Sequence, residues 1–276
     1  MEGALSDLVV NAMTGAGGTA PAGGGEALAR AAWAFVLVLA RVGPAMLLLP
    51  GVAEPFAPAM LRAGLALALA VLVCPMLQPG VPPLPDAGLA VAFAVAAEAA
   101  TGLWFGWLAR LWTQALVMAG QVIAYLLGLS SVLQPDAALG PQSTAFARMF
   151  ELAAPVIVLG TGLYGLPIRA LLALYDLVPP GRLLPLAAGA ERSTQAVGAS
   201  FALALQLASP FVVAAIVWHV AIGLAARLVP RMQVYFVAMP GQILGGLLLL
   251  SVAMGALLGA WRGALVTGWA TTFGVG

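Results

Sequence analysis

The sequence predicts an all-α helical protein of a membrane complex, and its composition is the first observation that does so. Of its 276 residues, 63% are hydrophobic and 8% are charged, against roughly 45–50% and about 25% in an ordinary soluble domain. A soluble fold of this length needs far more polar surface, so lipid or a large protein partner must surround most of the chain. Strand-like alternation does not compete with this interpretation, and a bilayer core accepts only helices or closed barrels.

Six apolar regions, taken in order, are the expected helices. They run from about residue 27 to 49, 56 to 77, 87 to 133, 146 to 177, 194 to 229 and 234 to 265. At about 1.5 Å per residue, the third region exceeds one bilayer crossing, so we expect two spans or a bent hairpin there. Residues 1–26 lack a basic n-region and hold a Gly/Ala-rich stretch, which predicts a flexible tail instead of a signal peptide.

Glycine and proline are placed so as to shape these helices. Glycines at four-residue spacing predict close helix packing, and they occur at Gly102 and Gly106, Gly241 and Gly245, and Gly255, Gly259 and Gly263. Prolines in helix interiors predict kinks, and they fall at Pro44, Pro50, Pro75, Pro155, Pro167, Pro210, Pro230 and Pro240.

Charged residues are scattered through the apolar regions, where each costs roughly 2.5–3.5 kcal/mol at mid-bilayer. They are Arg30, Arg41, Arg62, Glu98, Arg110, Arg148, Glu151, Arg169 and Arg227. Arg148 and Glu151 can pair on one helix face, whereas Glu98 and Arg110 point apart and each needs another partner. So many charges predict helices that face protein or water over much of their length. The arginines of the loops do not orient the chain by the positive-inside rule.

The inventory of reactive side chains favours a protein that is not an enzyme and has no metal or cofactor. The chain has one His, one Cys and no Lys, so cysteine-cluster metal sites and a phosphate-binding GxxxxGK[ST] loop are absent. The net charge of +1 gives no field for nucleic acid. Ser200 and His219 lie on one expected helix, about 28 Å apart by helical rise, which favours a helix-facing serine and a hydrogen-bonded histidine over a protease pair.

A mostly uncharged polar loop separates the third and fourth regions. It spans Ser130 to Ser143, and Pro135, Gly140 and Pro141 stop helix formation in it. The residues alone leave two readings open, a plain surface connection, which they favour, and a pore plug.

Three motifs, in order and at matching separations, resemble the FliR/SctT family of the type III protein-export gate over about residues 30 to 265. The first is Arg41, Pro50, Pro58, Arg62 and Leu65-Ala66; the second is Ala119-Gly120-Gln121, Gly128-Leu129-Ser130, Asp136 and Ala147-Arg148; the third is Gly223, Arg227, Pro230, Gln233, Phe236 and Pro240. The third motif departs from the family pattern at His219, Arg231 and Ala238-Met239.

This resemblance implies a domain organisation and a set of partners. Residues 27–190 would form FliP-like helical hairpins with a plug loop, and residues 191–276 a FliQ-like hairpin. One copy would join FliP/SctR-like and FliQ/SctS-like subunits, with FlhB/SctU-like and FlhA/SctV-like proteins nearby. The assembly would lie in the bacterial inner membrane at the flagellar basal body and pass unfolded export substrates. The chain shows no long polar C-terminal extension, which favours a flagellar over a virulence-type system.

The resemblance also implies roles for particular residues. The plug loop would comprise Gly128, Leu129, Ser130, Ser131, Val132, Leu133, Gln134, Pro135, Asp136 and Gly140. Structural roles would fall to Arg41, Pro50, Pro58, Arg62, Gly120, Gln121, Arg148, Glu151, Arg227, Pro230, Gln233 and Pro240.

The alternative function is a polytopic secondary transporter of a small solute. Such a transporter predicts two similar halves, but residues 27–135 and 146–265 show no convincing repeat.

Overall fold

The computed structural model describes residues 22–54, 56–128, 145–228 and 234–274, and in these ranges every regular element is a helix. The elements are α2 (Ala22–Leu48), α3 (Ala59–Leu77), the 3-10 turn η1 (Gln78–Gly80), α4 (Gly88–Leu126), α5 (Ala145–Gly160), α6 (Gly165–Leu177), α7 (Leu186–Leu228) and α8 (Val234–Phe273). Five helices are long and apolar enough to cross a membrane, and α5 with α6 makes a sixth candidate bent by 74°. The all-α membrane fold is therefore confirmed.

Helix α4 corrects the expectation of two spans or a bent hairpin between residues 87 and 133. It is one continuous helix of 39 residues, about 58 Å long, or nearly twice the thickness of a bilayer core. No proline interrupts its sequence, and 17 of its residues are buried. The bilayer limit applies to a helix wrapped in lipid, whereas α4 is wrapped largely by other helices of its own chain.

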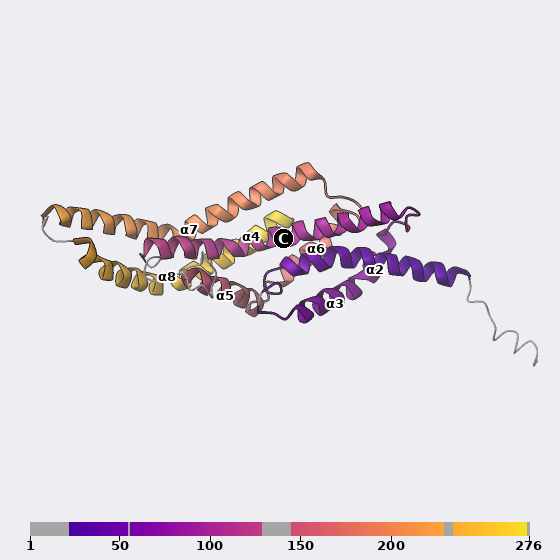
Figure 1. The fold of residues 1–276 in the computed structure, drawn as a ribbon, viewed down its shortest axis with the longest axis horizontal. Coiled ribbons are helices and arrows are strands. Elements are labelled where there is room, and N and C mark those ends of the chain that lie inside the picture. Colours follow the sequence, from indigo (N-terminus) through magenta and orange to yellow (C-terminus); the bar gives the residue numbers. More distant parts are fainter. Residues whose placement is uncertain (1–21, 55, 129–144, 229–233, 275–276) are drawn as a thin grey trace, which may run out of the picture.

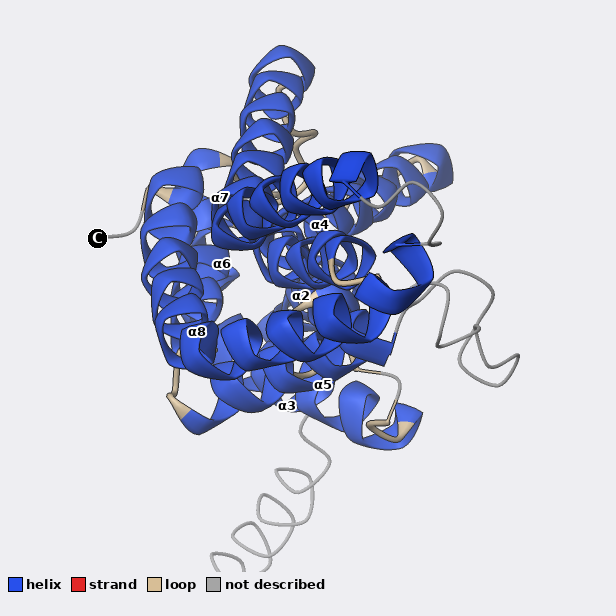
Figure 2. Cartoon of the chain, turned by 90° about the vertical axis from the view of Figure 1, so that its left-hand side faces the viewer, coloured by secondary structure: helices blue, strands red, loops and turns tan. Residues whose placement is uncertain are grey.

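The other helices are arranged around α4 in an elongated bundle (Figures 1 and 2). Helix α2 packs along the first half of α4, while α5, α7 and α8 contact it along the rest. Residue pairing shows that α2 and α7 run parallel to α4, and that α5 and α8 run antiparallel to it. The hairpin of α7 and α8 projects beyond the end of α4 (Figure 1).

The glycine spacing of α4 serves close packing, as predicted for Gly102 and Gly106. A Cβ atom at Gly102 would overlap the backbone carbonyl oxygen of Arg41, and one at Gly106 would lie 2.7 Å from the carbonyl oxygen of Ala45. The two helix backbones are thus in direct contact, which only glycine permits at these positions.

Of the eight prolines expected to kink helices, five lie in helix interiors, at Pro44, Pro75, Pro155, Pro210 and Pro240, and Pro167 lies in the first turn of α6. Helix α7, which holds Pro210 near its midpoint, changes direction along its length (Figure 1), as expected for a proline that removes one backbone hydrogen bond. Pro50 follows the end of α2 and Pro58 directly precedes α3. Helix α7 begins at Leu186, so the expected boundary between residues 190 and 191 falls inside its first turns.

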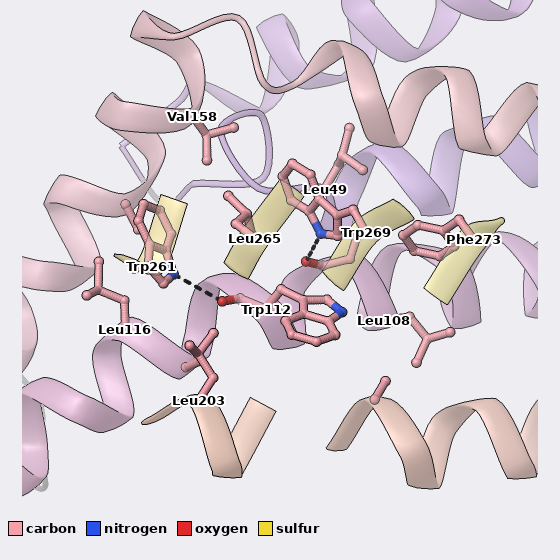
Figure 3. Close-up of a cluster of buried hydrophobic side chains, with 14 of the residues drawn as sticks. Leu49, Leu108, Trp112, Leu116, Val158, Leu203, Trp261, Leu265, Trp269 and Phe273 are labelled. Carbon is pink, nitrogen blue, oxygen red and sulfur yellow. Dashed lines mark hydrogen bonds between the residues drawn. The ribbon is translucent and has the colours of Figure 1, made fainter. Parts of the chain in front are cut away.

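The C-terminal half of α8 carries its bulky side chains into the core at every fourth residue. The buried set is Leu257, Trp261, Leu265, Trp269 and Phe273. The indole of Trp261 donates to the carbonyl oxygen of Trp112 at 3.2 Å, and that of Trp269 donates to the carbonyl oxygen of Ala109 at 3.1 Å (Figure 3). This part of α8 is therefore fixed along the middle of α4.

Candidate functional site

A fully buried ion pair joins α2 to α4. Arg41 and Glu98 both have zero exposure. The Nε atom of Arg41 donates to Oε2 of Glu98 at 2.5 Å, and Nη2 donates to Oε1 at 3.0 Å. This is the two-point arrangement that makes arginine–carboxylate pairs strong. Glu98 was expected to need a partner, and the structure identifies it as Arg41, 57 residues earlier in the chain.

The segment after α6 completes this ion pair. The Nη1 atom of Arg41 donates to the carbonyl oxygen of Val178 at 2.8 Å, and the backbone N–H of Gly181 donates to Oε1 of Glu98 at 2.6 Å. The guanidinium lies over the ring of Tyr175, 4.1 Å from its centroid. Helix α2, helix α4 and the segment after α6 thus meet at this ion pair. Both charged groups make several hydrogen bonds, which a pair removed from water requires.

The expected plug loop begins where α4 ends, and its first residue is in the described part of the chain. Gly128 has φ +72°, the left-handed conformation that commonly ends a helix and that glycine adopts without strain. Beyond the loop, α5 packs against α4 at Gly120, where a Cβ atom would overlap the ring of Phe150 and lie 3.3 Å from Cα of Ala147. The plug residues Leu129 to Asp136 and Gly140 lie outside the described residues.

The remaining family-motif residues are placed separately along the helices. Arg148 and Glu151 form the predicted ion pair on α5, at 2.8 Å and partly exposed. Arg62 on α3 has a buried Nε atom without a hydrogen-bond partner among the described residues. Gln121 lies in α4, partly buried, and Arg227 is exposed in the last turn of α7. Pro230 and Gln233 fall outside the described ranges.

The other two glycine series differ from Gly102 and Gly106. A Cβ atom at Gly241 would lie 3.1 Å from Trp218, but one at Gly245 would meet nothing within 4 Å. Gly255, Gly259 and Gly263 likewise have open space around them, on the face of α8 opposite its buried tryptophans. Close packing predicted from these last three positions is therefore not made within the described part of this chain.

Ser200 and His219 lie apart on the single helix α7. The Ser200 hydroxyl donates to the carbonyl oxygen of Val197 at 2.8 Å, and Nδ1 of His219 lies 2.7 Å from the carbonyl oxygen of Ala215. Each side chain is thus engaged with its own helix. Within the described ranges, no group of three His, Cys, Asp or Glu side chains is placed to hold a metal ion.

Two sets of contacts were not predicted from the sequence: those of the α8 tryptophans with α4, and those of backbone atoms with the buried ion pair. The tryptophans of α8 are spaced eight residues apart on one helix face, at Trp261 and Trp269, a pattern that could have marked the buried side of α8. The contacts of Val178 and Gly181 with the ion pair are made by backbone atoms, which carry no sequence signal.

These features define a class of protein: an integral membrane protein of long helices, held by a buried ion pair and by backbone-to-backbone packing. The sequence matches the model of the family described as bacterial export proteins, family 1, over residues 32–267. It is 33% identical over 225 residues to the flagellar biosynthetic protein FliR of Caulobacter vibrioides, covering 82% of this chain and 90% of that protein. It is 25% identical over 229 residues to FliR of Bacillus subtilis, covering 81% and 87%.

The chain belongs to this family of bacterial export proteins, the FliR family. The resemblance inferred from the three motifs is thereby confirmed. The protein is a component of the flagellar export apparatus, and its apolar helices place it in the bacterial inner membrane.

Proposed function

We propose that this chain forms one sector of the export gate and supplies the loop that plugs its pore. Unfolded export substrates would pass through a conduit lined by helix ends, and other components would supply the energy. A small, well-packed loop can keep such a conduit closed to ions by excluding water.

The observation that carries this proposal is the fixing of both ends of the loop. At the start of the loop, the backbone N–H groups of Leu127 and Gly128 donate to the carbonyl oxygens of Ile123 and Tyr125 in the last turn of α4. After the loop, Phe150 packs directly on Gly120 of the same helix. A loop whose two ends are anchored on one long helix can hold a defined position, which a plug requires and a surface connection does not.

The exposed apolar surface supports a place among sibling subunits. Only three of the 19 residues of α3 are buried, and only nine of the 43 residues of α7. We infer that FliP/SctR-like and FliQ/SctS-like subunits, together with lipid, cover these helices, and that FlhB/SctU-like and FlhA/SctV-like proteins lie close by. The lengths of α4, α7 and α8 exceed one bilayer crossing, which suits helices that extend beyond the lipid.

Deleting Leu133 to Gly140 tests the plug. The assembled complex carrying this deletion should conduct ions in the absence of substrate, because water would then enter the closed conduit. Conductance is measured in planar bilayers after purification with the partner subunits. An eight-residue deletion of residues 10–17, outside the family match, serves as the control. Unchanged conductance at normal assembly would count against the plug.

Family membership favours this function over the secondary transporter considered above. The two are separated by co-purification and by transport in liposomes. The export-gate proposal expects the chain to be recovered with both partner proteins. A purified chain that carries a small metabolite across liposomes without partners would support the transporter instead.

A further inference from the structure

Helix α4 carries a second charged side chain that the sequence predicts to have a partner on another element. Arg110 is half-buried, and the ion pair of Glu98 with Arg41 leaves it out. No carboxylate oxygen of the described residues lies within 4 Å of its guanidinium. A charge inside an apolar helix needs a compensating group, so the partner of Arg110 must act on it without direct contact.

Glu54, in the turn between α2 and α3, is a carboxylate that is buried with too few partners. The residue is 6% exposed, and within the described chain its carboxylate accepts one hydrogen bond, from the backbone N–H of Gly51 at 3.4 Å. A hydrogen bond of this length is weak, whereas a carboxylate removed from water needs good hydrogen bonds and a nearby positive charge. A group outside the turn must therefore stabilise Glu54.

One small cavity is lined by both of these side chains. It has a volume of about 10 Å³, and its lining also includes Pro50, Gln114, Glu151 and Pro155. A volume of about 10–15 Å³ is the least that holds one water molecule, which also needs two to four polar partners. Glu54, Arg110 and Gln114 can supply them.

The turn that carries Glu54 is packed against α5. Gly51 has φ +89°, and a Cβ atom there would lie 3.1 Å from the side chain of Leu159. A residue with a side chain is therefore strained at this position, both by its backbone conformation and by the contact with α5. The carboxylate of Glu54 is thus held at the cavity by a packed turn.

We propose that this cavity is a water-binding site, in which one water molecule joins Glu54 to Arg110. The water donates to a carboxylate oxygen and accepts from the guanidinium, so it connects two charges that do not touch. A metal cation suits the cavity less well, because the guanidinium already supplies the positive charge. Glu151 is 29% exposed and paired with Arg148, which leaves Glu54 as the main partner of Arg110. The bridge ties the turn after α2 to the middle of α4, independently of the loop after α4.

A density map of the purified wild-type complex, at a resolution that shows ordered water, tests the site directly. One water peak is expected at about 2.7–3.2 Å from both a carboxylate oxygen of Glu54 and a guanidinium nitrogen of Arg110. Direct contact between the two side chains, no peak between them, or a side chain of another subunit in the cavity overturns the proposal.

Double-mutant cycles then test whether the two charges act as a pair. Glu54→Gln and Arg110→Gln should each lower the unfolding temperature of the complex by about 2–4 °C, and the double variant should lower it by less than the sum. The matched control is Glu151→Gln, which removes the same charge from a partly exposed side chain on the same cavity. Its coupling to Arg110→Gln should be smaller, because water already solvates that charge. Equal coupling in the two cycles, or none with Glu54, overturns the bridge. Should Glu54→Gln prevent assembly, the wild-type map decides.

Discussion

Two regions of this molecule are stabilised in opposite ways. Around Arg41, three parts of the chain supply every contact that two buried charges need. In the projecting part of α7, none of residues 216–228 is buried, and large apolar side chains such as Val217 and Leu228 are 64% and 82% exposed. The first region is complete within the chain, whereas the apolar side chains of the second are not covered by any other part of the chain that the structure describes.

This difference explains why an apolar chain can carry charge. A lone arginine within a lipid-facing helix is costly, but Arg41 lies where α2, α4 and the segment after α6 meet, out of reach of lipid. Residues 216–228 hold one charged side chain, Arg227, which lies in the last turn of α7. Among the described residues, the buried charged side chains are Arg41, Glu54 and Glu98, and the hydrogen bonds that they make there are all to groups of this chain.

The largest loss of stability is expected from removing one partner of the buried Arg41–Glu98 ion pair. Arg41→Met would leave the carboxylate of Glu98 buried without its partner, which should destabilise the protein by about 3–5 kcal/mol. Thermal unfolding of the purified complex measures this loss. Arg41→Met combined with Glu98→Met should be less damaging than Arg41→Met alone, because no charge then remains unpaired. Equal losses in the two variants would show that the unpaired charge is not the cause.

Replacing a packed glycine is expected to have the next largest effect. Gly102→Ala puts a Cβ atom onto the backbone of Arg41, so α2 and α4 must separate, at about 1–3 kcal/mol. The matched control is Gly259→Ala on α8, where the added methyl group meets nothing and alanine favours the helix by about 0.5–1 kcal/mol. Unfolding temperatures should therefore move in opposite directions. A loss at Gly259 as large as that at Gly102 would show that the contact with the Arg41 backbone is not what makes Gly102 sensitive to substitution.

The sequence predicted that some glycines pack closely and that the buried charges have partners, but it did not predict where in the fold these contacts lie. Glycine spacing identified Gly102 and Gly106 as packing sites, yet the same spacing at Gly255, Gly259 and Gly263 faces open space. Spacing shows that a close approach is possible, while only the fold decides which helix approaches. The charge of Glu98 in an apolar region predicted that it has a partner, but that partner lies 57 residues away on another helix. Local spacing cannot reach that far.

The single helix α4 was missed for a related reason. The length of the apolar region from about residue 87 to 133 was judged against the thickness of a bilayer, which is the right reference only for helices surrounded by lipid. Local pairing was easier, because Arg148 and Glu151 are three residues apart, and their ion pair was predicted correctly. The ion pair inside one helix was thus predicted from the sequence, whereas the partner of Glu98 on another helix was not.

The smallest effect is expected at that second ion pair, which has the same chemical groups as the first. Arg148 and Glu151 are 2.8 Å apart, but their side chains are 36% and 29% exposed. Water already solvates both charges, so the charge that remains after one partner is removed is still solvated. Glu151→Gln should therefore cost about 0.2–0.5 kcal/mol, measured by thermal unfolding and reduced further at high salt. Combining it with Arg148→Gln in a double-mutant cycle isolates the pair itself. A cost approaching that of Arg41→Met would mean that burial does not separate the two pairs, and the contrast drawn between the regions would fail.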